Sequence, residues 1–222
     1  KSGAYALVFR NRYLLLIALL ILFLNWVNTT GEYILGRVIT QTAEAATGGS
    51  EAAMQTFIGK FYAEFFQVVN VVSLLMQLFL VSRILKYLGV RVALLILPII
   101  AFAGYSLAAF IPVLGIIRWV KTAENATDYS LQNTLRGVLF LPTTREQKYK
   151  AKQAIDTIFV RAGDVLSALL VYVGTTLLSF GTIQFALFNL GLVLVWFVLA
   201  AMIGREFRKL TDERAPEGAE AA

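Results

Sequence analysis

Charged and amide side chains recur at helical spacing between residues 118 and 136. They advance in steps of three and four residues, which places them on one side of a helix: Arg118, Lys121, Asn125, Asp128, Gln132 and Arg136. The segment should cross a lipid bilayer, where an ionisable side chain is costly unless it faces a bundle interior or a wet cavity. We therefore expect one continuous polar stripe that lines a solute pathway.

Three other segments also place polar side chains on one helical face. They carry Asn25, Asn28, Thr29 and Glu32, then Lys60, Glu64, Gln67 and Asn70, and finally Thr157, Arg161 and Asp164. Four such faces are typical of helices that surround a common hydrated cavity. We expect substrate contacts from Lys121, Asn125, Asp128, Gln132, Arg161 and Asn28, and gating or coupling roles for Glu32, Lys60, Glu64, Glu124 and Asp164.

A purely structural interpretation competes with this assignment. Three oppositely charged pairs lie three or four residues apart in the chain: Lys60 with Glu64, Lys121 with Glu124, and Arg161 with Asp164. Each pair can neutralise itself within its own helix. For the first pair, near the outer end of its helix, a gate or structural role is favoured over substrate contact. For Lys121 and Arg161, which lie deeper, contact with the cavity is favoured.

Composition indicates a helical protein that crosses a membrane several times. The 222 residues are 58% hydrophobic and 15% charged, whereas soluble domains are about half apolar and about a quarter charged. The chain has no cysteine and no histidine, which excludes thiol chemistry and imidazole metal sites. No pattern of a nucleophile with its base or of a metal cluster is visible. We expect no metal, no cofactor and no enzymatic activity.

Six stretches are long enough to span about 30 Å of hydrocarbon. They cover residues 12–39, 56–82, 90–112, 114–140, 153–179 and 182–203. Basic residues concentrate before the first stretch, in alternate connections and after the last, which places both termini in the cytoplasm. The net charge of +6 therefore reflects membrane orientation, and we expect no nucleic-acid partner. Residues 1–204 form the membrane domain, and 205–222 a cytoplasmic tail or linker.

The six stretches repeat one order of polarity. The third and the sixth contain no charge within their apolar part, while the other four do. This three-plus-three pattern is typical of secondary transporters and predicts that the third and sixth helices face lipid. We expect an all-α membrane fold that forms one half of a major-facilitator-type transporter. Its partner would be an amino-terminal six-helix half or a second copy, because a lone half would expose its polar faces to lipid. We also expect the chain to be a piece of a longer protein.

Residues 129–163 carry the most specific pattern in the chain. Its parts are Tyr129-Ser130-Leu131, Phe140-Leu141-Pro142, the run Glu146, Lys148, Lys150 and Lys152, Ala154-Ile155-Asp156, and finally Arg161 with Gly163. This pattern resembles the motif of the non-mitochondrial ATP/ADP antiporters, the nucleotide exchangers of plastids, intracellular bacteria and their free-living relatives. The resemblance implies a major-facilitator-type fold, nucleotide exchange and a place in a bacterial inner membrane.

Two acidic residues depart from the family's pattern. Asp128 stands where the family tends to have a basic residue, and Asp164 stands where the exchangers often carry lysine. Three interpretations stay open. The leading one is alternating-access transport of a charged solute, foremost a nucleotide, with Lys121 and Arg161 as anion contacts. The second is proton-coupled transport of a cationic or zwitterionic solute through Asp128 and Asp164. The third is a membrane sensor or scaffold that transports nothing.

Overall fold

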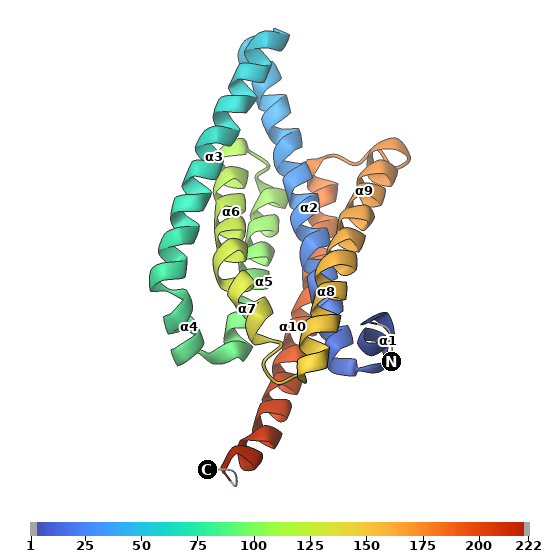
Figure 1. Ribbon diagram of the computed structural model, residues 1–222. Helices are drawn as coiled ribbons and strands as arrows, with labels where there is room; N and C mark the ends of the chain where they lie inside the picture. Colours follow the sequence, from blue (N-terminus) through green and yellow to red (C-terminus); the bar gives the residue numbers. More distant parts are fainter. Residues whose placement is uncertain (1–3, 220–222) are drawn as a thin grey trace.

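The structure, a computed structural model, describes residues 4–219 and the side chains of residues 6–213. All regular structure in this range is helical. The helices run alongside one another (Figure 1), with α1 and the last part of α10 at one end of the bundle and the connection between α2 and α3 at the other.

Thirteen helical elements follow one another in the described range, three of them short π-helical turns labelled η. They are α1 (Ala4–Arg10), α2 (Arg12–Thr47), α3 (Glu51–Phe79), α4 (Val81–Tyr87), α5 (Gly89–Phe110), α6 (Leu114–Thr127), η1 (Asp128–Gln132), α7 (Asn133–Val138), η2 (Gln147–Ala151), α8 (Lys152–Ala154), η3 (Ile155–Phe159), α9 (Val160–Thr176) and α10 (Thr182–Ala219). The segments α6–η1–α7 and η2–α8–η3–α9 each follow one another without a break.

Local sequence sets the ends of the longest early helix. The side-chain oxygen of Asn11 accepts hydrogen bonds from the backbone amides of Tyr13 and Leu14, which caps the start of α2. At its other end Gly48 adopts a left-handed conformation with φ of 62°, which glycine reaches without the steric cost of a Cβ atom.

Four helices are long and apolar enough to cross a membrane. They are α2, α3, α5 and residues Thr182–Glu213 of α10. The other two predicted spans, 114–140 and 153–179, correspond to the segments that contain π-helical turns. The structure therefore agrees with the predicted helical membrane protein, whereas the three-plus-three arrangement of six spans stays a prediction.

Two predicted boundaries differ clearly from the observed helices. The first span was expected to end at residue 39, but α2 continues to Thr47; the last was expected to end at residue 203, but α10 continues to Ala219. Beyond the apolar part of α10, Lys209 pairs with Glu206 and Arg208 with Asp212. Pairs three or four residues apart support a helix in water. Much of the predicted tail 205–222 is therefore helical, and residues 220–222 lie outside the described range.

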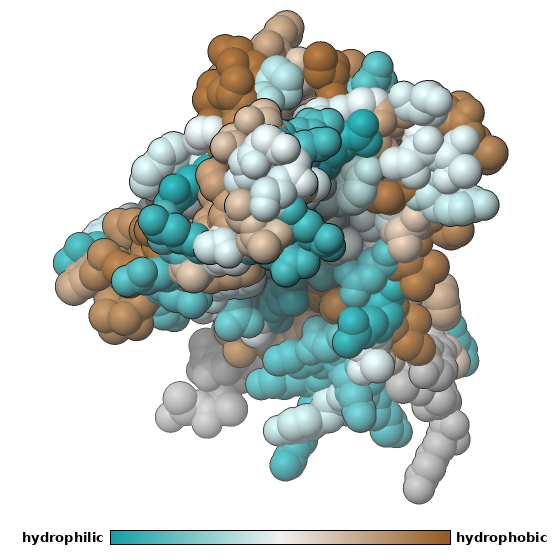
Figure 2. Space-filling model, turned by 90° about the horizontal axis from the view of Figure 1, so that it is seen from above, coloured by the Kyte–Doolittle hydropathy of each residue, from teal (hydrophilic) through white to brown (hydrophobic). Residues whose placement is uncertain are grey.

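The core of the bundle is centred on α2. Its side chains are buried along most of its length, among them Leu14, Leu20 and Leu24. Helix α10 packs along both α5 and α2, and α9 packs along α2. The predicted lipid-facing helices α5 and α10 thus pack against each other, and both also expose large apolar side chains such as Phe110 and Val198. Seen from the α2–α3 end, hydrophilic residues run through the middle and hydrophobic residues occupy parts of the rim (Figure 2).

Candidate functional site

A buried lysine lies at the centre of the polar stripe. The side chain of Lys121, on α6, is 1% exposed. Its ammonium donates a 2.8 Å hydrogen bond to the side-chain oxygen of Asn28 on α2. The ammonium also lies 3.4 Å from Oε1 of Glu32 and 3.2 Å from Oε2 of Glu124. A lysine ammonium has three donors, so these three neighbours can satisfy it completely.

Two more side chains hold the carboxylates in place. Asn125 donates a 2.8 Å hydrogen bond to Oε1 of Glu32. The hydroxyl of Tyr105, from α5, lies 2.9 and 3.2 Å from the two carboxylate oxygens of Glu124 and donates to them. We call these residues the lysine cluster: Lys121, Glu124, Asn125, Asn28, Glu32 and Tyr105. The cluster joins α2, α5 and α6 and contains two carboxylates for one ammonium.

Two buried amides on the α6–η1 segment keep an unpaired atom. Oδ1 of Asn125 and Nε2 of Gln132 have no hydrogen-bond partner in the protein, although both residues are 1% exposed. An unsatisfied buried polar atom costs about 1–3 kcal/mol. Oδ1 of Asn125 could accept a hydrogen bond from a polar ligand or an ordered water, and Nε2 of Gln132 could donate one. A substrate contact at these two residues stays a prediction.

The predicted stripe contains a second ion pair, at Asp128. This residue begins the π-helical turn η1, and its carboxylate lies 3.7 Å from the guanidinium of Arg136. No ion pair between Asp128 and Lys121 occurs in the described part of the chain. The π-turn lies within the predicted stripe, and the Asp128–Arg136 pair spans it. The charges of the stripe form two ion-paired sets, Lys121 with Glu32 and Glu124, and Asp128 with Arg136. That the two sets line one continuous pathway stays a prediction.

The predicted residues of α9 form a third group next to α2. Arg161 lies 3.5 Å from Oδ2 of Asp164, and its side chain is 81% exposed. The other oxygen of Asp164 accepts a 2.9 Å hydrogen bond from Thr29, the residue after Asn28 in the lysine cluster. Arg161 and Asp164 thus lie near the cluster along α2, without a direct bond to Lys121 in the described structure.

Lys60 and Glu64 lie toward the α2–α3 end of the bundle and do not join the lysine cluster. Glu64 pairs with Arg118 of α6 at 3.8 Å, and the described residues offer Lys60 no ion pair. All three side chains line an open cavity of about 400 Å³ between α3 and α6. The within-helix pair of Lys60 with Glu64 was an expectation, and the structure replaces it with a pair between two helices.

Three residues that matter to the cluster were missed from sequence. Tyr105 binds Glu124, and Asn189 of α10 donates a 3.0 Å hydrogen bond to the carbonyl oxygen of Val27, next to Asn28. Gly31 leaves the space that the Tyr105 hydroxyl and the Lys121 ammonium occupy. For Asn189, the sequence signal was a single amide within an otherwise apolar stretch, which is typical of a hydrogen bond between helices. Residues 6–213, whose side chains the structure describes, include no group of three or more acidic side chains placed to hold a metal ion.

Comparison with known proteins identifies one matching family. Residues 101–207 match a family model described as TLC ATP/ADP transporter. The match covers just under half of the chain and includes Tyr105, Lys121, Glu124 and Arg161, whereas α2 and α3 lie outside it. No curated protein and no solved structure matches the chain.

Proposed function

We propose that this chain belongs to the ATP/ADP transporter family and forms half of a membrane transporter that moves a charged solute, foremost a nucleotide. The observation that carries the proposal is the lysine cluster. Most of its residues lie inside the segment that matches an ATP/ADP transporter model, and its lysine is buried between helices long enough to cross a membrane. Charge in such a place is typical of a solute pathway.

Arg161 is the cation best placed for a first contact with phosphate. Its guanidinium is largely exposed and has a single carboxylate partner at 3.5 Å. A guanidinium can bind two phosphate oxygens at once in a fixed geometry. A phosphate that approaches along α9 would therefore meet Arg161 before it reached the lysine cluster.

Lys121 takes a different role, because its donors are already occupied. A phosphate can bind this ammonium only by replacing one of the present partners. Glu32 is the replaceable one, since its side chain is 35% exposed while that of Glu124 is 3% exposed. Exchange of Glu32 for phosphate would break the Lys121–Glu32 ion pair, one of the contacts that hold α2 against α6. Anion binding would thus be coupled to helix movement, which alternating access requires.

The transporter would be completed by a second six-helix unit. The exposed faces of α3 and α9 carry Lys60, Glu64 and Arg161, and such faces need a partner in a bilayer. An amino-terminal half or a second copy of this chain would enclose them. The three-plus-three order of polar and apolar helices supports the major-facilitator arrangement.

Nucleotide exchange in proteoliposomes tests this function. The full-length protein that contains the chain is reconstituted with ADP inside, and uptake of labelled ATP is measured. We expect Arg161→Gln and Lys121→Gln each to reduce uptake by roughly tenfold or more, the loss of about 1.4 kcal/mol of binding. Arg83→Gln, another exposed arginine, is the matched control and should transport normally. Normal uptake by both test variants would refute the site assignment.

A second function has support from the excess of carboxylates. The lysine cluster has two carboxylates for one ammonium, and Asp164 lies next to it along α2. Such sites could carry a proton together with a cationic or zwitterionic solute. Uptake that depends on a pH gradient and is not inhibited by ATP or ADP would select this function. A sensor or scaffold would instead leave cysteines introduced along 118–136 accessible from one side only.

A further inference from the structure

Two adjoining cavities lie where the apolar part of α10 gives way to its charged part. The first, of about 540 Å³, is lined by Arg12 of α2, Arg91 of α5 and charged residues of α10. The second, of about 360 Å³, lies between α5 and α10. Arg91 and Arg205 line both cavities, so the two arginines stand at the junction of a charged space and an apolar one.

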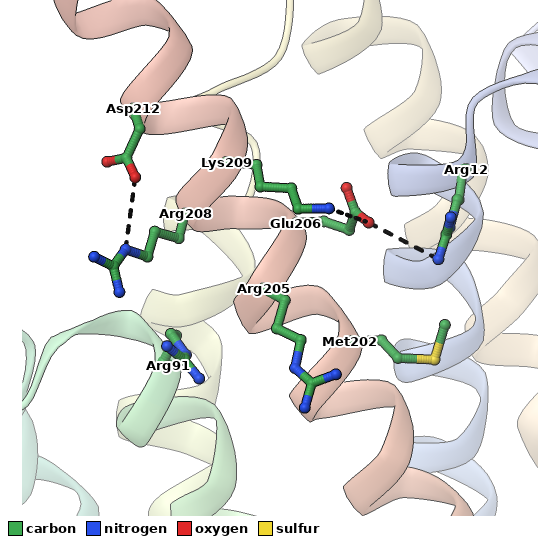
Figure 3. Close-up of a pocket in the computed structure, with 8 residues that line it drawn as sticks. All are labelled: Arg12, Arg91, Met202, Arg205, Glu206, Arg208, Lys209 and Asp212. Atoms are coloured by element: carbon green, nitrogen blue, oxygen red, sulfur yellow. Dashed lines mark ion pairs between the residues drawn. The ribbon is translucent and has the colours of Figure 1, made fainter.

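The first cavity has an excess of positive charge. Its lining includes five basic and two acidic side chains. Glu206 is shared by Arg12 at 3.8 Å and Lys209 at 3.9 Å, and Asp212 pairs with Arg208 at 3.5 Å. Figure 3 shows these three ion pairs, and none of them reaches Arg91 or Arg205. Within the described structure these two arginines have no carboxylate partner, so their guanidinium groups are available to an anion.

The second cavity is apolar apart from the same two arginines. Its other lining residues are Leu88, Val92, Leu95, Ala200, Ala201 and Gly204. The two helices approach closely at Gly204, where an added Cβ atom would lie 3.0 Å from Cγ of Arg91. The small residues of α10 thus leave an apolar groove that leads away from the arginines along α5.

We propose that these cavities together bind one anionic glycerophospholipid. Arg91 and Arg205 would bind its phosphate, the basic lining of the first cavity would hold the rest of the headgroup, and an acyl chain would lie in the groove between α5 and α10. Basic pockets between membrane helices at the bilayer surface are suited to anionic headgroups. The groove favours a lipid, since a free phosphate has no apolar part to bury there and a nucleotide has no acyl chain to lie along it.

Native mass spectrometry of the full-length protein in detergent tests the proposal. The protein is mixed with phosphatidylglycerol or, for comparison, with phosphatidylcholine, and bound lipid is counted. We expect bound phosphatidylglycerol to fall by roughly tenfold or more in R91Q/R205Q, because two headgroup cations are lost. Both positions are exposed, so the fold should tolerate the change. R83Q/K86Q on α4 removes two other exposed basic side chains and should bind like the unchanged protein.

A second variant tests the groove itself. Ala201→Trp places a large side chain in the groove and leaves every charge in place. We expect it to reduce phosphatidylglycerol binding several-fold without changing any binding of inorganic phosphate. Equal lipid binding by R91Q/R205Q and R83Q/K86Q would overturn the proposal. A site that takes inorganic phosphate and is insensitive to Ala201→Trp would also overturn it, in favour of a free anion. Neither outcome depends on what the chain transports.

Discussion

The ammonium of Lys121 lies 2.8 Å from the side-chain oxygen of Asn28, and this hydrogen bond ties α6 to α2. Glu32, one helical turn further along α2, reaches the same ammonium. Apolar packing between helices in a bilayer does not strongly determine how far one helix is shifted along the other. Polar bonds between the helices do determine this register. The lysine cluster therefore has a structural effect in addition to its proposed part in transport.

Replacing Lys121 with methionine should strongly destabilise the protein. Glu124, whose side chain is 3% exposed, would become a buried carboxylate without a counter-charge, which costs about 3–5 kcal/mol. The measurement is thermal unfolding in detergent. The double variant K121M/E124Q should recover much of the loss, because the uncompensated charge is gone. Lys60→Met is the control and should change stability by less than about 0.5 kcal/mol. Equal stability of Lys121→Met and Lys60→Met would contradict this account.

Gly163→Ala should weaken the packing of α9 on α2. A Cβ atom at this position would lie 2.7 Å from the carbonyl oxygen of Leu22 and 2.8 Å from Cβ of Asn25, so the helices would have to separate. We expect a loss of about 1–3 kcal/mol in thermal unfolding. Gly59→Ala on α3, where the new atom meets nothing within 4 Å, should be neutral or stabilising. A Gly163→Ala protein as stable as Gly59→Ala would show that this contact is not tight.

Asp128 and Arg136 should behave as one energetic unit. Their charged groups lie 3.7 Å apart on the same helical segment. A double-mutant cycle of Asp128→Asn and Arg136→Gln, read by thermal unfolding, should give a coupling free energy of about 0.5–3 kcal/mol. Arg83→Gln combined with Asp128→Asn provides the unpaired comparison and should be additive. Additive effects in both cycles would mean that the pair does not contribute.

Acid should loosen the π-helical turn η2. Lys150 donates a 2.7 Å hydrogen bond to Glu146 and lowers the pKa of that carboxyl below its ordinary 4.5. A lowered pKa means that the stabilising effect is complete above pH 4.5 and is lost as the pH falls through the lowered pKa. We expect the protection of the amides of residues 147–151 against hydrogen exchange, taken relative to the intrinsic exchange rate at each pH, to fall on acidification in the unchanged protein. Glu146→Gln should lack this step. Glu44→Gln, a change in a distant exposed residue, should retain the step.

Sequence periodicity was sufficient for relationships within one helix. The three-residue spacing of Lys121 and Glu124 predicted their pair, and that of Arg161 and Asp164 predicted theirs. Contacts between helices depend on how far one helix is shifted and rotated against the next, which periodicity does not determine. Asn25 shows this limit, since it was placed on the polar face but donates its amide to the carbonyl oxygen of Ile21 in its own helix.

The absence of charged residues from two of the predicted stretches did not mean that these helices contribute nothing to the site. The third and sixth stretches were assigned to the lipid because their apolar parts contain no charged residue. Tyr105 and Asn189 from these helices nevertheless turn inward and bond to Glu124 and to the backbone of α2. Burying a hydroxyl or an amide in an apolar helix costs far less free energy than burying a charge. An apolar stretch without charge can therefore still supply polar groups to a buried site.

The π-helical turn at Asp128–Gln132 makes the chain sensitive to length in an unusual way. A π-turn accommodates one residue more than the surrounding α-helix would, and at 3.6 residues per turn one residue corresponds to a rotation of roughly 100°. Deleting a single residue here would change the length of the helix very little. It would instead rotate the whole of α7 about the helix axis, so that Arg136 would face a different neighbour. A one-residue insertion or deletion would thus change the contacts of every side chain on α7, whereas a substitution changes those of one side chain.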